Sequence, residues 1–351
     1  MEKLLSDSEV LWLRSTLDAA ERIVLCGHVG PDGDALGSTL ALYHWLVRMG
    51  KKATVVVPNV FPDFLNWLPG SADVQVFFKQ PELVTQTVGE ADMVFIVDMN
   101  VSSRLQNVEQ VVLERDVPRV LIDHHPEPDE SLAKLIVSRP EMCAASEVVC
   151  HLLWQLGEMD TLTTDEATCL YTGMMCDTGA FTFNSTRPVV YECISRLLER
   201  GIDKDWIYRQ VFFTASEARL RLQGYLLYVN MKVIKGLNAS IMTLTNEERK
   251  RFSCKNGDTE GFVNIPLQIL GMRLSVFLNQ NTEQPEMIRV SLRSVDDFPC
   301  NEMAAQFFNG GGHKNASGGH LYCTMEEAVK ITQKAIQSFT DKLKKKDQSF
   351  P

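Results

Sequence analysis

Several features are scarce or missing in this sequence of 351 residues, and each absence narrows its function. No apolar run reaches the ~18 residues that a membrane-spanning helix needs, so we expect no membrane association. The polar first residues do not resemble a signal peptide. The nine cysteines form an odd set without a C-x-x-C pair, which favours reduced thiols over a disulfide framework. We therefore expect a cytoplasmic protein.

A broad basic surface is also missing. The 35 Lys and Arg residues are outnumbered by 45 Asp and Glu residues, and the formal charge is −10. Long duplex nucleic acid is bound mainly through many cationic contacts to phosphate, so we exclude it as a partner. A small anionic substrate would need a local positive pocket instead.

The composition is that of a folded globular protein, with 45% hydrophobic and 23% charged residues. At ~150 residues per domain, the length predicts two domains. Continuous apolar runs of strand length at Arg22–Gly27, Asp92–Val97 and Arg119–Ile122 alternate with helical patterns such as Ala35–Met49. Runs of this kind are typical of strands covered on both faces of a parallel sheet.

The predicted fold class is α/β, with an N-terminal parallel-sheet domain joined by a helical linker to a smaller mixed α/β C-terminal domain. Helical patterns fill most of 144–228, and strand candidates then recur from Met231 to Leu292, before a glycine-rich segment and a final helix from Met325. We predict the first domain over 1–190, the linker over 191–215 and the second domain over 216–345.

Acidic and imidazole side chains follow the predicted strands. His28, Asp32 and Asp34 come after the first run, Asp98 ends the second, and Asp123-His124-His125 ends the third. Because the carboxyl ends of parallel strands meet at one sheet edge, these side chains are expected to converge there. Taken alone, Asp32 and Asp34 are better explained as turn and helix N-cap residues. With Asp177, which follows a helix, the set holds five carboxylates and three imidazoles, and so much buried negative charge needs cations.

The segments H-V-G-P-D-G-D-A-L-G-S, V-D, D-H-H and C-D-T-G together resemble the four motifs of the DHH phosphoesterase superfamily. The segment Gly310–Gly319, G-G-G-H-K-N-A-S-G-G, resembles the signature of the DHH-associated domain. The resemblance extends over most of the chain. It implies a catalytic domain, a flexible linker and a substrate-binding domain, with the active site in the cleft between the two domains.

The resemblance also implies a two-metal centre. Its pattern gives His28 and Asp32 to one ion, Asp34, His124 and Asp177 to the other, and Asp98 to both. Oxygen-rich ligation suits Mn²⁺ and, less well, Mg²⁺. Two such ions generate a hydroxide and stabilise the attacking and leaving oxygens of an in-line displacement, so the implied reaction is phosphoryl ester hydrolysis.

Other residues receive supporting roles. Asp123 is expected to orient an imidazole through its free ring nitrogen, and His125 to donate to the transferring phosphoryl group, with a turn-stabilising imidazole as the alternative. The glycine-rich segment is expected to cradle a phosphate with backbone amides, while nearby cationic groups bind it through their side chains. The predicted substrate-binding residues are Arg104, Arg293, Gly311, Gly312, His313 and Lys314.

Within the superfamily, the chain resembles the compact group that degrades short oligonucleotides (nanoRNA and linear dinucleotides) and 3′-phosphoadenosine 5′-phosphate. Expected partners are short RNA or DNA oligonucleotides or small nucleotides, and a homodimer stays open. A cyclic-dinucleotide phosphodiesterase and a polyphosphate hydrolase are the enzymatic alternatives. A nucleotide-binding regulatory protein with a decayed site is the non-enzymatic one, although all six implied metal ligands are present.

Overall fold

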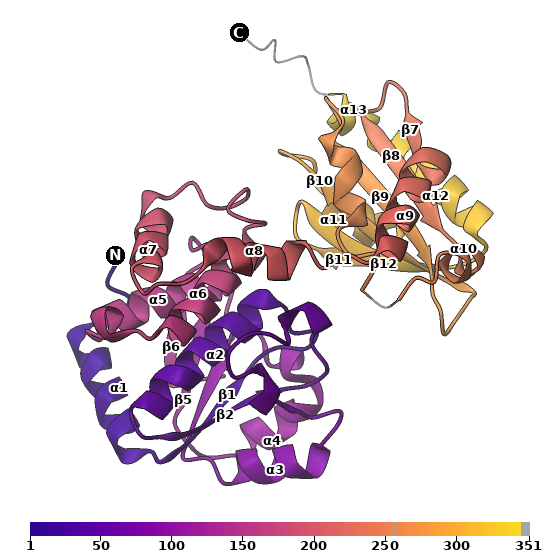
Figure 1. Cartoon of the computed structure of the whole chain (residues 1–351). Helices are drawn as coiled ribbons and strands as arrows, with labels where there is room; N and C mark the ends of the chain where they lie inside the picture. Colours follow the sequence, from indigo (N-terminus) through magenta and orange to yellow (C-terminus); the bar gives the residue numbers. More distant parts are fainter. Residues whose placement is uncertain (256, 345–351) are drawn as a thin grey trace. The chain divides into compact units, whose positions relative to one another are not determined.

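The computed structural model describes residues 1–255 and 257–344. The chain forms two compact units, the first from Met1 to Thr214 and the second beginning at Ala215 (Figure 1). The predicted linker, 191–215, covers most of α7 (Pro188–Leu198) and all of α8 (Lys204–Phe212), both of which lie in the first unit. Val190 and Ile207 from these helices are buried in the core of that unit.

A six-stranded parallel sheet organises the first unit, and it confirms the predicted fold class. The strand order is β3-β2-β1-β4-β5-β6. The order reverses between β1 and β4, and the crevice at such a switch point is where ligands bind in open α/β sheets. The strands are β1 (Arg22–Cys26), β2 (Lys52–Val57), β3 (Gln75–Val76), β4 (Met93–Val97), β5 (Arg119–Asp123) and β6 (Leu135–Ser138).

Helices cover both faces of this sheet, as its continuous apolar strands require. Alternate residues of β1 serve different cores: Ile23 and Leu25 pack in one, Val24 and Cys26 in the other. The first core is closed by α1, α2, α5 and α6, and the second by α3 and α4. These helices are α1 (Asp7–Ala19), α2 (Gly33–Arg48), α3 (Pro81–Gly89), α4 (Glu109–Leu113), α5 (Ala145–Gln155) and α6 (Thr164–Asp177).

The second unit is built on a mixed six-stranded sheet in the order β11-β12-β10-β9-β8-β7. Of the strand pairs described in this second sheet, β8 and β9 are parallel and the others are antiparallel. The predicted strands at 239–244 and 287–292 are present, and the glycine-rich segment contributes β11 and part of β12. The strands are β7 (Lys232–Ile234), β8 (Ala239–Leu244), β9 (Leu274–Gln280), β10 (Met287–Ser294), β11 (Gly311–Gly312) and β12 (Ala316–Tyr322).

The two faces of this second sheet are covered unequally. On one face α11 and α12 bury Ile288, Val290 and Leu292 of β10. On the other face α9 and the helical turn after it cover β8 and β9 through Met242 and Phe277. The helices of this unit are α9 (Glu217–Tyr225), α10 (Asn246–Arg251), α11 (Cys300–Phe307), α12 (Met325–Ser338) and α13 (Thr340–Leu343).

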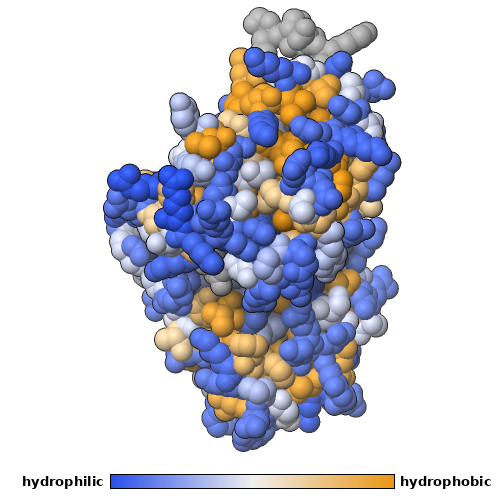
Figure 2. Space-filling model, turned by 90° about the vertical axis from the view of Figure 1, so that its right-hand side faces the viewer, coloured by the Kyte–Doolittle hydropathy of each residue, from blue (hydrophilic) through white to orange (hydrophobic). Residues whose placement is uncertain are grey.

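The surface mixes hydrophilic and apolar side chains, and Figure 2 shows apolar surface gathered over the second unit on the face that it presents. In the second unit, Tyr228 and Leu270 are among the most exposed large hydrophobic side chains, at 92% and 96%. Within 1–255 and 257–344, no helix has the length and apolar character needed to cross a membrane.

Candidate metal centre

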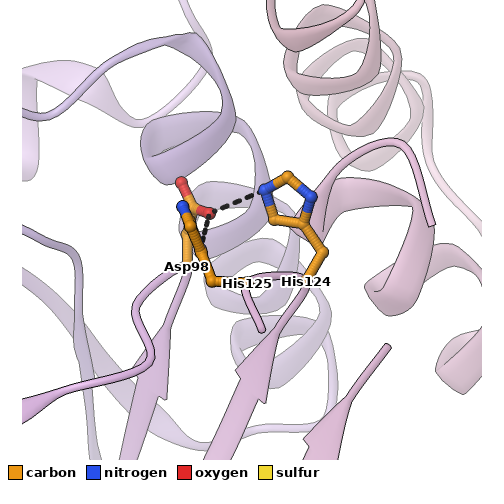
Figure 3. A group of neighbouring side chains, drawn as sticks. All are labelled: Asp98, His124 and His125. Atoms are coloured by element: carbon orange, nitrogen blue, oxygen red, sulfur yellow. Dashed lines mark ion pairs between the residues drawn. The ribbon is translucent and has the colours of Figure 1, made fainter. Parts of the chain in front are cut away.

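The ends of three neighbouring strands bring their side chains together, as the sequence predicted. His28 follows β1, Asp98 follows β4, and His124 and His125 follow β5. The two Asp98 oxygens face different rings: Oδ2 lies 3.3 Å from His28 Nε2, and Oδ1 lies 3.4 Å from His124 Nε2. Asp98 Oδ1 also lies 3.8 Å from His125 Nδ1, and the dashed lines of Figure 3 mark the ion pairs of Asp98 with His124 and His125. Asp98 is therefore the side chain that joins the site.

Three groups of side chains at this edge have the composition and spacing to hold a cation. One contains Asp98, His124 and His125, a second His28, Asp32 and Asp98, and a third Asp34, His124 and Asp177. The second and third groups contain the same residues that the resemblance assigned to the two ions. Asp98 and His124 each belong to two groups. All six predicted ligands thus lie in one cluster.

Asp32 and Asp34 reach the cluster from the start of α2, and both also make local contacts. Asp32 Oδ1 accepts from the backbone N–H groups of Asp34 and Ala35, so this residue is the N-cap of α2. Asp34 is buried, and its two oxygens accept from the N–H groups of Ala145 and Ser146 at the start of α5, at 2.6 and 2.9 Å. The capping alternative is thus correct for Asp32 without removing it from the cluster.

Glycine residues allow α2 and α6 to pack closely, and this close packing brings Asp34 and Asp177 into the same cluster. A Cβ atom added at Gly37 would lie 2.5 Å from the carbonyl oxygen of Cys169 on α6, and one at Gly173 would lie 2.8 Å from Asp34 Oδ1 on α2 and 2.0 Å from Ser146 Oγ on α5. A Cβ atom at Gly33 would meet Cys176 Sγ at 2.3 Å, so Cys176 packs against the start of α2. Glycine at these positions is required by the helix crossing.

Burial and mutual charge perturb the acids and bases of the cluster. Burial raises the pKa of Asp98, but its contacts with His124 and His28 outweigh this and leave the pKa below its ordinary value. Burial, together with the charges of Asp98 and Asp177, raises the pKa of Asp34. Burial lowers the pKa of His124, but its contact with Asp98 and the charges of the surrounding carboxylates outweigh this and raise the pKa. A cation would neutralise the same repulsion.

The donors fit a divalent metal ion. Asp98 Oδ1 is buried and accepts no hydrogen bond from the described residues. Asp98 also has a positive φ of 61°, an uncommon conformation for a residue with a side chain, which aims its carboxylate between the strand ends. An unsatisfied buried oxygen among carboxylates and imidazoles suits Mn²⁺ or Mg²⁺, which prefer oxygen and nitrogen ligands to thiolates.

A hydrogen-bonded chain runs from Asp123 through His125 to Arg104. Asp123 is fully buried and accepts from His125 Nδ1 at 2.7 Å and from the His125 backbone N–H at 3.0 Å. Arg104 Nη1 lies 3.1 Å from His125 Nε2. Because a guanidinium only donates, His125 Nε2 must accept and the ring proton is on Nδ1. The imidazole that Asp123 orients is therefore that of His125, and His125 in turn holds Arg104.

In the second unit, the predicted substrate-binding residues lie along β10 and a β11–β12 hairpin. Arg293 pairs with Ala316 across the ladder, and Ala316 in turn exchanges backbone hydrogen bonds with His313. A Cβ atom at Gly310 or Gly312 would collide with backbone atoms of β12, at 1.9 and 2.7 Å. These two glycines thus serve the close packing of the hairpin, whereas Gly311 is exposed and has open space beside it. Lys314 lies at the turn of the hairpin.

Family models match both units of the chain. The DHH family, N-terminal domain, matches residues 22–174, and the DHHA1 domain matches residues 236–345. The fold and the family together define a phosphoesterase, so the predicted class of enzyme, a phosphoric ester hydrolase, is confirmed. The chain belongs to the DHH family.

Individual relatives extend over nearly the whole chain. A bifunctional oligoribonuclease and PAP phosphatase, NrnA, from Thermus thermophilus is 30% identical over 85% of this chain and 84% of its own length. An exopolyphosphatase-related protein from Bacteroides fragilis, solved by crystallography, is 45% identical in sequence to this chain. Its structure matches with a TM-score of 0.95 over 98% of this chain and 100% of that one. RecJ of Thermus thermophilus in complex with Mn²⁺ shares the fold, with a TM-score of 0.55 and 15% identity over 98% of this chain and 55% of RecJ.

Sequence reasoning missed the partners that hold the predicted residues in place. The Ala145 and Ser146 N–H groups that bind Asp34 come from a helix start that the sequence did place, near 144. Nothing in the sequence indicates that this helix start faces Asp34. The Arg104–His125 contact was missed for the same reason, because it depends on how the segment after β4 folds back over the site.

Proposed function

We propose that this chain hydrolyses short oligonucleotides and 3′-phosphoadenosine 5′-phosphate at a two-metal centre. The observation that carries the proposal is the sharing of Asp98 and His124 among three potential metal-binding groups at the switch point of the sheet. The relative named oligoribonuclease and PAP phosphatase supports the choice of substrates. Two metal ions bound in these groups would supply a hydroxide and stabilise the oxygens of the displacement.

The proposed ligands are His28 and Asp32 for one ion, Asp34, His124 and Asp177 for the other, and Asp98 between them. The donor set favours Mn²⁺, with Mg²⁺ as the alternative. The backbone N–H groups at the start of α5 hold both Asp34 oxygens, which fixes the direction of that carboxylate. A positioned carboxylate loses less freedom when an ion binds.

Asp123, His125 and Arg104 are proposed to handle the phosphoryl group. Asp123 keeps the His125 proton on Nδ1, and His125 Nε2 holds the guanidinium of Arg104 beside the metal groups. Arg104 then offers planar N–H donors to a phosphate. His125 becomes a donor to the phosphoryl group only if Arg104 releases its Nε2 atom and this nitrogen is protonated.

The second unit is proposed to bind the rest of the substrate through Arg293, Gly311, Gly312, His313 and Lys314. Burial lowers the pKa of Arg293, but a guanidinium remains charged at neutral pH. We propose a catalytic domain over 1–190, a connection over 191–215 and a substrate-binding domain over 216–345, with α7 and α8 of the connection packed on the core of the first unit. The family models, which end at 174 and begin again at 236, support this organisation. Residue 345 lies outside the described residues.

A panel of substrates tests the proposal. Initial rates with Mn²⁺ are compared for 3′-phosphoadenosine 5′-phosphate, RNA of two to five nucleotides, RNA of about twenty nucleotides, a cyclic dinucleotide and polyphosphate. Short oligonucleotides and 3′-phosphoadenosine 5′-phosphate should be cleaved with the highest kcat/KM. Faster cleavage of the twenty-nucleotide RNA would replace the proposal with a general exonuclease, and binding of all substrates without cleavage would favour the regulatory protein.

Location and assembly complete the proposal. All nine cysteines are free, which suits the reducing cytoplasm in which nucleotides are processed. We propose cytoplasmic location without membrane association, and leave a homodimer as the open alternative to a monomer. Sedimentation at several protein concentrations decides the assembly state.

A further inference from the structure

Among residues 215–255 and 257–344, no helix packs on part of one face of the second sheet. The residues of β10 that alternate with the buried Ile288, Val290 and Leu292 are Met287, Arg289, Ser291 and Arg293, and none of these four is buried. On this face, α9 packs in a buried cluster whose strand residues come from β8 and β9. The turn Phe262–Gln268 also contacts β10, but Arg289 on β10 and Tyr322 on β12 are exposed, so this end of the β10–β12 half is accessible.

Strand register divides this surface into rows. Gly311, Gly318 and Ser291 pair across β11, β12 and β10, and they form a floor with almost no side-chain volume. One wall beside this floor is formed by His313, Ala316 and Arg293. His313 and Arg293 are two of the predicted substrate-binding residues.

The opposite wall, which the family resemblance did not predict, is formed by the paired residues Arg289 and His320. Arg289 is exposed, and within the described parts of the chain it makes no ion pair. Asn279 pairs with Arg289 on its other side and accepts from Arg249 Nη2 at 2.5 Å, which places a second guanidinium beside this row. The row is thus positively charged although the chain as a whole is acidic.

An aromatic ring stands at the end of the same wall. Tyr322 is 63% exposed, and its ring contacts that of His320 edge-on at a centroid distance of 5.5 Å. Arg289 and Arg293 are four residues apart on one strand, about 13 Å, which is farther than a single phosphate reaches. The two walls therefore suit successive nucleotides of one strand. Flat surfaces with cations for phosphate and aromatic rings for bases are typical of single-strand binding.

We propose that Arg289, His320 and Tyr322 form a second nucleotide subsite. Arg289 and His320 bind a phosphate of the substrate that is not the one cleaved, and the ring of Tyr322 stacks on a base. This proposal rests on the proposed function and names the part of the molecule that distinguishes oligonucleotides from a mononucleotide. A mononucleotide such as 3′-phosphoadenosine 5′-phosphate leaves the subsite empty.

Length-resolved kinetics test the subsite. Arg289→Ala and Tyr322→Ala should each raise KM for an RNA pentanucleotide at least fivefold. The kcat/KM for 3′-phosphoadenosine 5′-phosphate should stay within twofold of the wild-type value. Tyr322→Phe should behave as wild type because stacking needs only the ring. The matched controls are Lys330→Ala, on the helix that covers the opposite face, and Tyr228→Ala, another exposed tyrosine.

A binding measurement separates this proposal from the proposed function. Fluorescence anisotropy with a labelled pentanucleotide is recorded as a function of salt in the Asp98→Ala background, with and without Arg289→Ala. Loss of Arg289 should weaken binding and reduce the slope of log K against log salt by about 0.7, one phosphate contact to a single strand. Equal losses for pentanucleotide and mononucleotide, or no loss for either, overturn the subsite. A wild-type chain that cleaves neither substrate yet binds the pentanucleotide through Arg289 overturns the proposed function alone.

Discussion

Replacing Gly37 with alanine tests whether the close crossing of α2 and α6 builds the metal centre. The added Cβ atom would lie 2.5 Å from the carbonyl oxygen of Cys169 and 2.9 Å from the Gly173 nitrogen. These are backbone atoms, so no side chain can rotate away. The carbonyl would have to withdraw by about 0.9 Å to restore an ordinary contact of 3.4 Å.

The cost follows from two opposing effects. Overpacking of a filled core destabilises by about 1–3 kcal/mol, whereas alanine in a helix interior is favoured over glycine by up to about 1 kcal/mol. We expect a net loss of about 1–2 kcal/mol, which lowers the melting temperature of a unit of this size by about 2–8 °C. Metal sites tolerate ligand displacements of only about 0.2 Å, so Mn²⁺ affinity should fall at least tenfold.

Thermal unfolding by circular dichroism and Mn²⁺ titration by electron paramagnetic resonance measure both effects. Gly224→Ala in α9 is the matched control, because its Cβ atom would meet nothing within 4 Å. That variant should unfold at the wild-type temperature or slightly above it. A Gly37→Ala protein that matches the control in stability and binds Mn²⁺ as the wild type does would refute the role of the helix crossing.

Three further predictions address individual groups. Asp123→Asn should lower kcat at least tenfold while leaving Mn²⁺ content unchanged, since Asp123 orients His125 rather than a proposed ligand; loss of metal by atomic absorption would contradict this. Arg293→Ala and His313→Ala should raise KM for a dinucleotide without changing metal content, and an unchanged KM would remove them from the substrate site. Burial lowers the pKa of His151, but contacts with Cys193 and Glu147 raise it to about 9. Because the folded pKa lies above the ordinary value, the stabilisation is complete below pH 6.5 and is lost as the pH rises through 9. Urea unfolding should show this loss, at most about 3 kcal/mol, in the wild type and not in His151→Gln.

The sequence predicted strands well where apolar residues run continuously. The segments at β1, β4 and β5 were placed within a residue or two, because strands covered by helices on both faces need apolar side chains at every position. The glycine-rich segment was expected to cradle a phosphate with its backbone amides, and no strand was predicted there, yet β11 and part of β12 form from it. Glycines favour strands only weakly, and the seven-residue pairing of β12 with β10 outweighs that preference.

The site was predictable to the extent that it depends on strand ends. Asp98 and His124 follow adjacent parallel strands, so topology alone brings them together. The partners of Asp34 and His125 were not predictable, because they depend on how α5 and the segment after β4 pack. The positive φ of Asp98 left no signal in the sequence either.

The most direct test is to count the metal ions bound per chain and to measure hydrolysis in the same samples. After equilibrium dialysis against limiting Mn²⁺, the wild type should hold two ions and cleave a dinucleotide. Asp98→Ala should bind fewer ions and lose activity, whereas Glu130→Ala, which alters an exposed loop acid, should retain both. Wild-type turnover by Asp98→Ala under these conditions would contradict a two-metal centre joined by Asp98.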